Sequence, residues 1–299
     1  MKGNFLWKKG SGGMAYPMDP DQLIKASSSW ALDIDALAPW TTMSFTDEPE
    51  NQFWVSGADK KTDQLIITGP CSSSMDIAWH FISKKILMEW GSILSLSQWN
   101  GRGQLGRMWV SPVGNIYSAV QIPSPPQPWH NLLPLIVGFS LLQSFAQIDI
   151  NMMLKWPNDL VMDNKKVGGV LIERKEDMVV VGVGLNLISN PVKEQLRNHN
   201  VIAAASLKDF GFNFTPFGLW KNLIGRCRDN FKEIIETKTP SEFVTLIHEY
   251  LAFKDNMVNF TDHENKTCKA IVMGLAETGG LKLLINNKIK IVQSGYICP

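Results

Sequence analysis

Residues 154–173 read LKWPNDLVMDNKKVGGVLIE, and this stretch decides how the fold is interpreted. Apolar, strand-like residues surround Asp163 and Asn164, a pair that fits a tight hairpin turn. We therefore expect short strands at residues 160–162 and 166–173, on the two sides of the turn. Further short strands are expected beside this hairpin in the sequence, at residues 151–156 and 178–185.

Polar side chains in the same stretch indicate a ligand site. Lys155, Asn158 and Asp159 lie among apolar strand residues, and buried polar groups need partners, which a ligand can supply. Asp159 is a candidate Mg²⁺ ligand, because magnesium at nucleotide sites uses one or two carboxylates together with phosphate oxygens. Lys166 precedes the small residues VGG, so a ligand could lie against the strand within reach of its ammonium group. Taken alone, Lys166 fits a solvated turn lysine better, and only its surroundings make it a candidate.

A second informative segment, residues 98–115, reads QWNGRGQLGRMWVSPVGN. Its glycines let backbone N–H groups approach an anion, and its arginines offer fixed forks for carboxylate or phosphate. No GKS or GKT follows, so it is not a Walker loop, and no clear helix continues past its GxGxxG spacing, as a dinucleotide site requires. The glycines alone would fit a flexible surface loop. Together with the two arginines they indicate a site for a ligand that carries carboxylate and phosphate groups.

The rest of the chain predicts alternating strands and helices followed by a β-rich tail. Residues 1–63 are hard to interpret, with one short helix expected at about 21–30, Asp19 or Asp21 near its cap, and no second helix at helix-turn-helix spacing. Residues 189–215 read as loop. Further helices are expected at about residues 74–89 (capped by Ser73 or Ser74), 131–145, 217–235 and 240–253. Further strands are expected at residues 65–68, 93–96, 116–122, 258–260, 269–273, 281–285 and 289–293.

Composition sets the class of protein. The 299 residues carry a net charge of +1, which argues against a general nucleic-acid coat. The four cysteines form no CxxC pair, so free thiols in a reducing cytoplasm are expected rather than a metal cluster or a disulfide framework. The amino terminus lacks the apolar run of a signal peptide, and no stretch is apolar enough to span a membrane. We expect a cytoplasmic protein with no membrane partner.

The two segments together resemble the biotin–protein ligases of the biotin/lipoate protein ligase superfamily. That family's loop pattern GRGRxGRxWxSPxGN is matched by GRGQLGRMWVSPVGN, and its KWPND and KxGGIL motifs by KWPNDL and KVGGVL. SSMD at residues 73–76, GVGLN at residues 182–186 and ASL at residues 205–207 resemble three further family motifs. The tail sequence VMGLAETGGLKLL resembles the family's small carboxyl-terminal barrel. The resemblance covers about residues 64–295, and the pairing of the loop with KWPND is specific.

The resemblance implies both a fold and an activity. The fold class is α+β, with a mixed sheet flanked by helices as in class II aminoacyl-tRNA synthetases, and a small SH3-like barrel. The implied domains are an amino-terminal extension (1–63), a catalytic domain (64–253) and the SH3-like domain (254–299). The implied reaction forms biotinyl-5′-AMP from biotin and ATP with Mg²⁺, and then transfers biotin to a lysine of a biotin carboxyl carrier protein. A homodimer is a candidate assembly, and DNA binding is not expected because residues 1–63 do not resemble a helix-turn-helix.

The resemblance also implies residue roles. Lys166 and Arg102 would be catalytic, with Lys166 neutralising charge at the reacting carboxyl–phosphate centre, and Asp159 would hold Mg²⁺. Biotin would be bound by Ser73, Ser74, Met75, Gln98, Gly101, Arg102, Lys166 and Gly169. ATP or the adenylate would be bound by Arg102, Gly103, Gln104, Arg107, Trp109, Asn158, Lys166 and Asn186, with Trp109 stacking near the adenine.

Two departures from the family pattern and two alternative functions remain. Gln104 replaces the second arginine of GRGR, which predicts weaker retention of the adenylate, and Ser74 replaces a threonine but keeps the hydroxyl. One alternative is a lipoate–protein ligase, which SPxGN and KWPND disfavour. The other is a non-catalytic module that senses biotin or its adenylate, which pyrophosphate release without a carrier would exclude.

Overall fold

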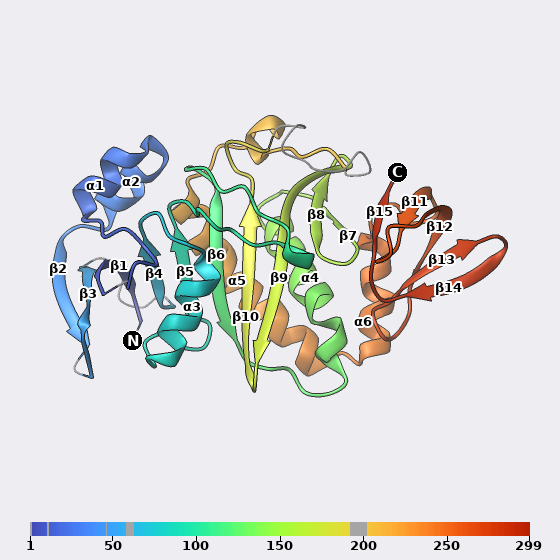
Figure 1. The fold of residues 1–299 in the computed structure, drawn as a ribbon, viewed down its shortest axis with the longest axis horizontal. Coiled ribbons are helices and arrows are strands. Elements are labelled where there is room, and N and C mark those ends of the chain that lie inside the picture. The colour runs from blue at the N-terminus through green and yellow to red at the C-terminus, as the bar shows by residue number, and fades with distance from the viewer. Residues whose placement is uncertain (1, 11, 46, 58–62, 192–201) are drawn as a thin grey trace. The chain divides into compact units, whose positions relative to one another are not determined.

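The computed structural model describes residues 2–10, 12–45, 47–57, 63–191 and 202–299 (Figure 1). Contacts divide the chain into two compact units. The first unit comprises residues 1–124, 171–189 and 206–222, and the second comprises residues 125–170, 190–205 and 223–299. Among the described helices, none combines the length and apolar character that crossing a membrane requires.

The first unit is built on a mixed β-sheet. Within this unit the strands follow the order β2 (Trp40–Phe45), β3 (Glu48–Ser56), β1 (Asn4–Lys9), β4 (Leu65–Thr68), β5 (Ser92–Ser95), β6 (Ile116–Ile122) and β10 (Met178–Leu185). The pairs β1–β4 and β4–β5 are parallel, and the other neighbours are antiparallel. Strand β4 is buried at all four positions, as expected of a strand with neighbours on both edges.

Helix α3 (Ser74–Ser83) packs against β5, β6 and β10. Ser73 caps it: its backbone is extended and its hydroxyl accepts a hydrogen bond from the backbone N–H of Met75 at 3.2 Å. Ile77, Phe81 and Ile82 recur at helical spacing and are buried in the core of this unit. The helix ends at Ser83, one to two turns earlier than the expected residue 89.

Residues 1–63 contribute strands that the sequence did not reveal. Strand β1 pairs with β4, and β2 and β3 continue the sheet outward. Two short helices, α1 (Pro20–Ala26) and α2 (Ser28–Ala36), stand where one was expected. Ser27 ends α1 and caps α2, so one residue separates the two helices, fewer than the three to four of a helix-turn-helix. The cap of α1 is Asp19, which exchanges hydrogen bonds with Gln22.

The second unit contains an antiparallel meander of β7 (Met153–Lys155), β8 (Asp159–Met162) and β9, whose residues up to Val170 belong here. Strand β9 (Lys165–Lys175) continues into the first unit from Leu171. The turn at Asp163 and Asn164 has φ of +45° and +60°, the left-handed pair of a tight hairpin turn, which confirms the expectation. Helix α4 (Leu133–Ala146) is almost wholly buried and packs on β7 and β8.

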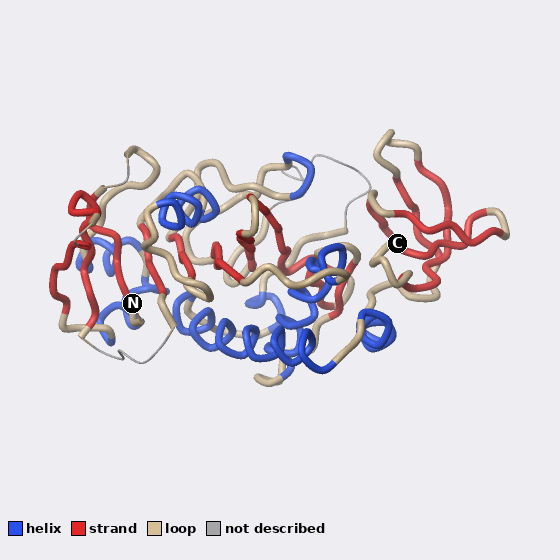
Figure 2. The backbone as a smooth tube through the Cα atoms, turned by 90° about the horizontal axis from the view of Figure 1, so that it is seen from below, coloured by secondary structure: helices blue, strands red, loops and turns tan. Residues whose placement is uncertain are grey.

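The remaining described elements are helices and a small carboxyl-terminal sheet. They include α5 (Pro216–Thr237), which crosses the boundary between the units, and α6 (Pro240–Ile247). The small antiparallel sheet has the order β14 (Lys288–Val292), β13 (Leu281–Ile285), β12 (Thr267–Leu275), β11 (Met257–Thr261) and β15 (Tyr296–Cys298), and the end of the chain lies among its strands (Figure 2). Strand β15 was not expected from the sequence.

The expected loop at residues 189–215 is described only in part. Residues 192–201 lie outside the described residues, and a short 3₁₀ turn, η4 (Leu207–Phe210), interrupts the described remainder. The predicted domain limits at 63/64 and 253/254 stay a prediction. Residues of the extension and of the predicted catalytic domain occur together in the first unit.

Candidate functional site

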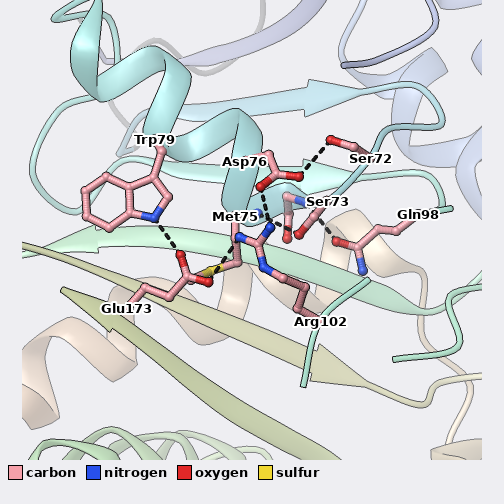
Figure 3. A network of polar contacts seen from close by, with 9 residues as sticks. Ser72, Ser73, Met75, Asp76, Trp79, Gln98, Arg102 and Glu173 are labelled. Atoms are coloured by element: carbon pink, nitrogen blue, oxygen red, sulfur yellow. Dashed lines mark hydrogen bonds and ion pairs between the residues drawn. The ribbon is translucent and has the colours of Figure 1, made fainter. Parts of the chain in front are cut away.

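The start of α3 brings together three of the expected biotin-binding residues (Figure 3). Ser73 and Ser74 are buried at the first turn of the helix. The backbone N–H of Ser74 donates to Oε1 of Gln98 at 2.7 Å, and Nε2 of Gln98 donates to Oγ of Ser111 at 2.9 Å. Met75 is buried on the same turn, where a Cβ on Gly182 would lie 2.8 Å from its sulfur. These hydrogen bonds order a polar surface made of Ser73, Ser74 and Gln98, which we call the wall.

Arg102 is held by two carboxylates that the sequence analysis did not assign (Figure 3). Nη1 pairs with Oδ1 of Asp76, and Nη2 lies 3.0 Å from Oε1 of Glu173. The other oxygen of each carboxylate is also used: Ser72 donates to Asp76 at 2.9 Å and the indole of Trp79 to Glu173 at 2.7 Å. We call these five side chains the arginine clasp.

Opposite charges hold Arg102 to Asp76 and Glu173 in the arginine clasp. Burial lowers the pKa of Arg102, but its bonds and charge interactions with Asp76 and Glu173 outweigh burial and raise it, so the group stays ionised. Its side chain is 32% exposed, so the pairing is only partly screened by solvent. Its Nε is buried and has no hydrogen-bond partner among the described residues.

The expected role of Arg102 stays a prediction. Each of its terminal nitrogens pairs with one protein carboxylate and carries two N–H groups. Glu173 closes the stretch KVGGVLIE on β9, and the only local signal of its role was an acidic residue at the end of an apolar strand.

The glycine-rich loop is folded against the protein. A Cβ on Gly101 would lie 2.5 Å from the carbonyl oxygen of Trp109, and one on Gly184 would lie 2.5 Å from the indole of Trp109. Only glycine permits these approaches. The backbone N–H of Gly103 donates to the carbonyl of Arg107 at 2.7 Å, and Gln104 begins a single 3₁₀ turn between them.

Asn115 closes this loop, and the sequence analysis assigned it no role. Its Oδ1 accepts hydrogen bonds from the backbone N–H groups of Leu187, Ile188 and Ser189, at 2.9, 3.1 and 3.3 Å. The expected adenylate ligand Asn186 immediately precedes this triplet and is buried, with its carbonyl accepting from the N–H of Leu207 at 2.9 Å. The asparagine of SPVGN thus holds the segment after β10 in place.

The second unit holds a separate charged group. Nζ of Lys155 lies 2.8 Å from Oδ2 of Asp159, and Nζ of Lys166 lies 2.5 Å from Oδ1 of the same residue. The side chains of Lys155, Asp159 and Lys166 are 7%, 13% and 26% exposed. We call Lys155, Asp159 and Lys166 the lysine triad. Its two ammonium groups share one carboxylate, so the triad has a net charge of +1. Burial acts to raise the pKa of Asp159, but the two lysines outweigh burial and hold that pKa well below its usual range.

Local structure fixes the triad. Asp159 pairs with Gly169 across β8 and β9, and the side-chain amide of Asn158 donates to the carbonyl of Val170. Two backbone hydrogen bonds hold the main chain of Lys166. Its N–H donates to the carbonyl of Ala203 at 2.7 Å, and its carbonyl accepts from the N–H of Ala205 at 2.9 Å. Its ammonium is therefore held by the pairing of strands as well as by charge.

The contacts of Asp159 do not fit a protein-held metal ion. Both of its oxygens already accept from ammonium groups, and the described residues contain no group of three or more His, Cys, Asp or Glu side chains arranged to hold a metal. Its position fits an ion-pair partner for Lys155 and Lys166.

The expected site residues fall into two groups, one in each unit. The first unit holds Ser73, Ser74, Met75, Gln98, Gly101, Arg102, Gly103, Gln104, Arg107, Trp109 and Asn186, and the second holds Asn158, Asp159, Lys166 and Gly169. Residues 68–186 include every one of them and match the model of the biotin/lipoate A/B protein ligase family. These residues of the chain are therefore similar to that family over the stretch that carries every expected site residue.

Relatives and a solved structure show the same similarity. The chain is 27% identical over 209 residues to the bifunctional ligase/repressor BirA of Escherichia coli, and 26% identical over 211 residues to the biotin–protein ligase of Homo sapiens. These matches cover 67% and 64% of this chain, but only 60% and 28% of the two relatives. The structure is similar to that of the Aquifex aeolicus biotin protein ligase in complex with biotin and ATP, with a TM-score of 0.66 and 27% identity over 78% of this chain and 97% of that one. The mixed sheet with its helices is thus the fold of a biotin ligase catalytic domain.

Proposed function

We propose that this protein is an ATP-dependent biotin–protein ligase. It joins biotin to ATP as biotinyl-5′-AMP and then transfers the biotin to a lysine of a biotin carboxyl carrier protein. The observation that carries the proposal is the lysine triad: a net positive, largely buried group on the strands that bear KWPND and KVGG. A buried surplus of positive charge stabilises a ligand that is itself an anion.

The chemistry needs positioning and charge rather than a protein nucleophile. In the first step a carboxylate oxygen of biotin attacks the α-phosphorus of ATP and pyrophosphate leaves. In the second step the carrier's lysine amine attacks the acyl carbon, the anhydride bond breaks, AMP leaves and the amine loses a proton. Lys166 stabilises the negative charge that both steps develop, and Asp159 orients its ammonium. ATP supplies Mg²⁺ as its phosphate-bound counter-ion.

Different residues of the proposed site contact different parts of biotin and ATP. The wall of Ser73, Ser74 and Gln98 offers hydrogen-bonding groups to the ring of biotin. The backbone around Gly101 contacts the carboxylate and the phosphate, and the neighbouring Arg102, which Asp76 and Glu173 keep ionised, adds positive charge there. Trp109 offers a flat surface near the adenine. Asn158, Gly169 and Asn186 complete the proposed contacts.

Other parts of the proposal follow from the family. The small carboxyl-terminal sheet corresponds to the SH3-like barrel of biotin ligases. The indole of Trp156, in KWPND, donates to the carbonyl of Gly279 in that region at 2.9 Å, a link inside the second unit between the motif and the tail.

The four free cysteines suit a reducing compartment such as the cytoplasm. The proposed homodimer is testable by sedimentation.

The test is a two-stage assay. The protein is incubated with ATP, Mg²⁺ and biotin, and pyrophosphate release is measured without a carrier. A biotin carboxyl carrier domain is then added, and its mass is measured before and after reaction. We expect biotin-dependent pyrophosphate release in the first stage and a carrier heavier by one biotinyl group in the second.

Controls separate the alternatives. Lipoate replaces biotin in a parallel reaction, and a carrier with its acceptor Lys replaced by Arg reports on specificity. Absence of pyrophosphate release would refute the proposal and favour a sensing module, and a preference for lipoate would move the assignment to a lipoate ligase.

A further inference from the structure

The amino-terminal extension reaches the candidate site through a short ribbon of backbone pairings. Single bridges connect Ala15 to Cys71 antiparallel, Cys71 to Gln98 parallel, and Gln98 to Ser111 antiparallel. Residues 14–16 are therefore the outermost of four segments that lie side by side. The other three segments contain Cys71, which lies just before α3, Gln98, and Ser111 at the end of the glycine-rich loop. We call this arrangement the four-segment ribbon.

The contacts of the outer segment are direct and short. The backbone N–H of Tyr16 donates to the carbonyl of Pro70 at 2.8 Å, and that of Ser72 donates to the carbonyl of Met14 at 2.7 Å. Ser72 is also the residue that donates to Asp76 in the arginine clasp. The segment thus borders the turn that delivers Ser73 and Ser74.

Gln98 and Trp99 are neighbours in the chain, and their side chains have different partners. The side chain of Gln98 bonds to Ser74 and Ser111. The ring of Trp99 instead meets Tyr16, with ring centroids 5.2 Å apart and a tilt of 58°. Tyr16 is 64% exposed and Trp99 is 47% exposed, so ordinary core packing does not account for the pair.

We propose that Tyr16 is a positioning residue for biotin, acting through Trp99 and the four-segment ribbon on Gln98. This inference rests on the proposed function. The contact between Tyr16 and Trp99 holds the segment that carries Gln98, and Gln98 presents its amide to the ligand. The extension, which lies outside the residues that match the family model, is then a working part of the site.

The experiment measures initial rates of biotin-dependent pyrophosphate release by the full-length protein. Tyr16→Ala is expected to raise the KM for biotin about three- to tenfold, the range expected for loss of one aromatic pair, while kcat at saturating biotin stays within about twofold. Tyr16→Phe keeps the ring and restores the KM. Trp99→Ala gives the same rise, and the double variant Tyr16→Ala with Trp99→Ala is no worse than Trp99→Ala alone.

The matched control is Leu32→Ala, which removes another exposed apolar side chain, 76% exposed on α2 of the same extension. Melting temperatures are measured for every variant. An unchanged KM for biotin in Tyr16→Ala, or an equal rise in Leu32→Ala, overturns the inference while wild-type activity still supports the proposed function. Lack of biotin-dependent pyrophosphate release by the wild-type protein instead overturns the proposed function.

Discussion

Replacing Asp159 with Asn tests the lysine triad most directly. The substitution keeps the shape of the side chain but removes the charge that Lys155 and Lys166 share. Two ammonium groups then face a neutral amide in a site with little solvent. Asn retains one carbonyl oxygen, which can accept from only one of the two lysines in good geometry.

The expected loss of stability follows from that geometry. Removing one partner of a buried ion pair costs about 3–5 kcal/mol, because the remaining charge stays desolvated. Lys166 is 26% exposed and can recover some hydration, whereas Lys155 is 7% exposed and cannot. We therefore expect a loss near the lower end, about 3 kcal/mol at pH 7.

The pH dependence has a definite sign. The folded pKa of Asp159 is depressed below its ordinary value of 3.8, so its contribution to stability is fully present above that value. It is lost as the pH falls from about 4 toward the folded pKa. The difference in unfolding free energy between wild-type and Asp159→Asn should be constant from pH 5 to 8 and shrink below about pH 4.

The assay is urea unfolding followed by tryptophan fluorescence. The matched control is Asp163→Asn, the same substitution on an exposed turn residue of the same hairpin, where Asn also tolerates the positive φ. A second variant, Asp159→Asn with Lys155→Met, should regain part of the loss because it removes the buried unpaired charge. A loss below about 1 kcal/mol, or no recovery in the double variant, would refute the reasoning.

Three further outcomes are expected. Lys166→Ala should leave the fold intact and slow biotinyl-adenylate formation by about 10²-fold or more, because it removes the charge at the reacting centre, whereas Lys165→Ala, on the exposed neighbour, should not; near-normal pyrophosphate release would contradict this. Gln104→Arg should slow the release of biotinyl-adenylate by adding a fixed cation to the loop, and an unchanged off-rate in a stopped-flow chase would count against it. Gly225→Ala, in the interior of α5 where no atom lies within 4 Å of the new Cβ, should raise the unfolding free energy by about 0.5–1 kcal/mol in urea titrations, and destabilisation would show that the helix is constrained there.

Much of the local structure could be predicted from sequence patterns. Buried runs and turn residues predicted β4, β6, β10 and β13 with the bounds that the structure has. The cap at Ser73 and the hairpin turn after β8 were equally clear, because caps and turns depend on residues a few positions apart. The family motifs also predicted a mixed sheet with a glycine-rich loop.

Contacts between distant segments decided the rest. The ion pairs of Arg102 with Asp76 and Glu173 could not be predicted, because no local pattern connects those residues. The same holds for β1, which pairs with β4, and for Tyr16, which meets Trp99. Periodicity reports which face of an element is apolar, but the partner of a charge or of a strand edge depends on the packing of the whole chain. The sequence by itself determined which chemical groups the proposed site contains, and the tertiary structure alone decided which of those groups are paired with one another.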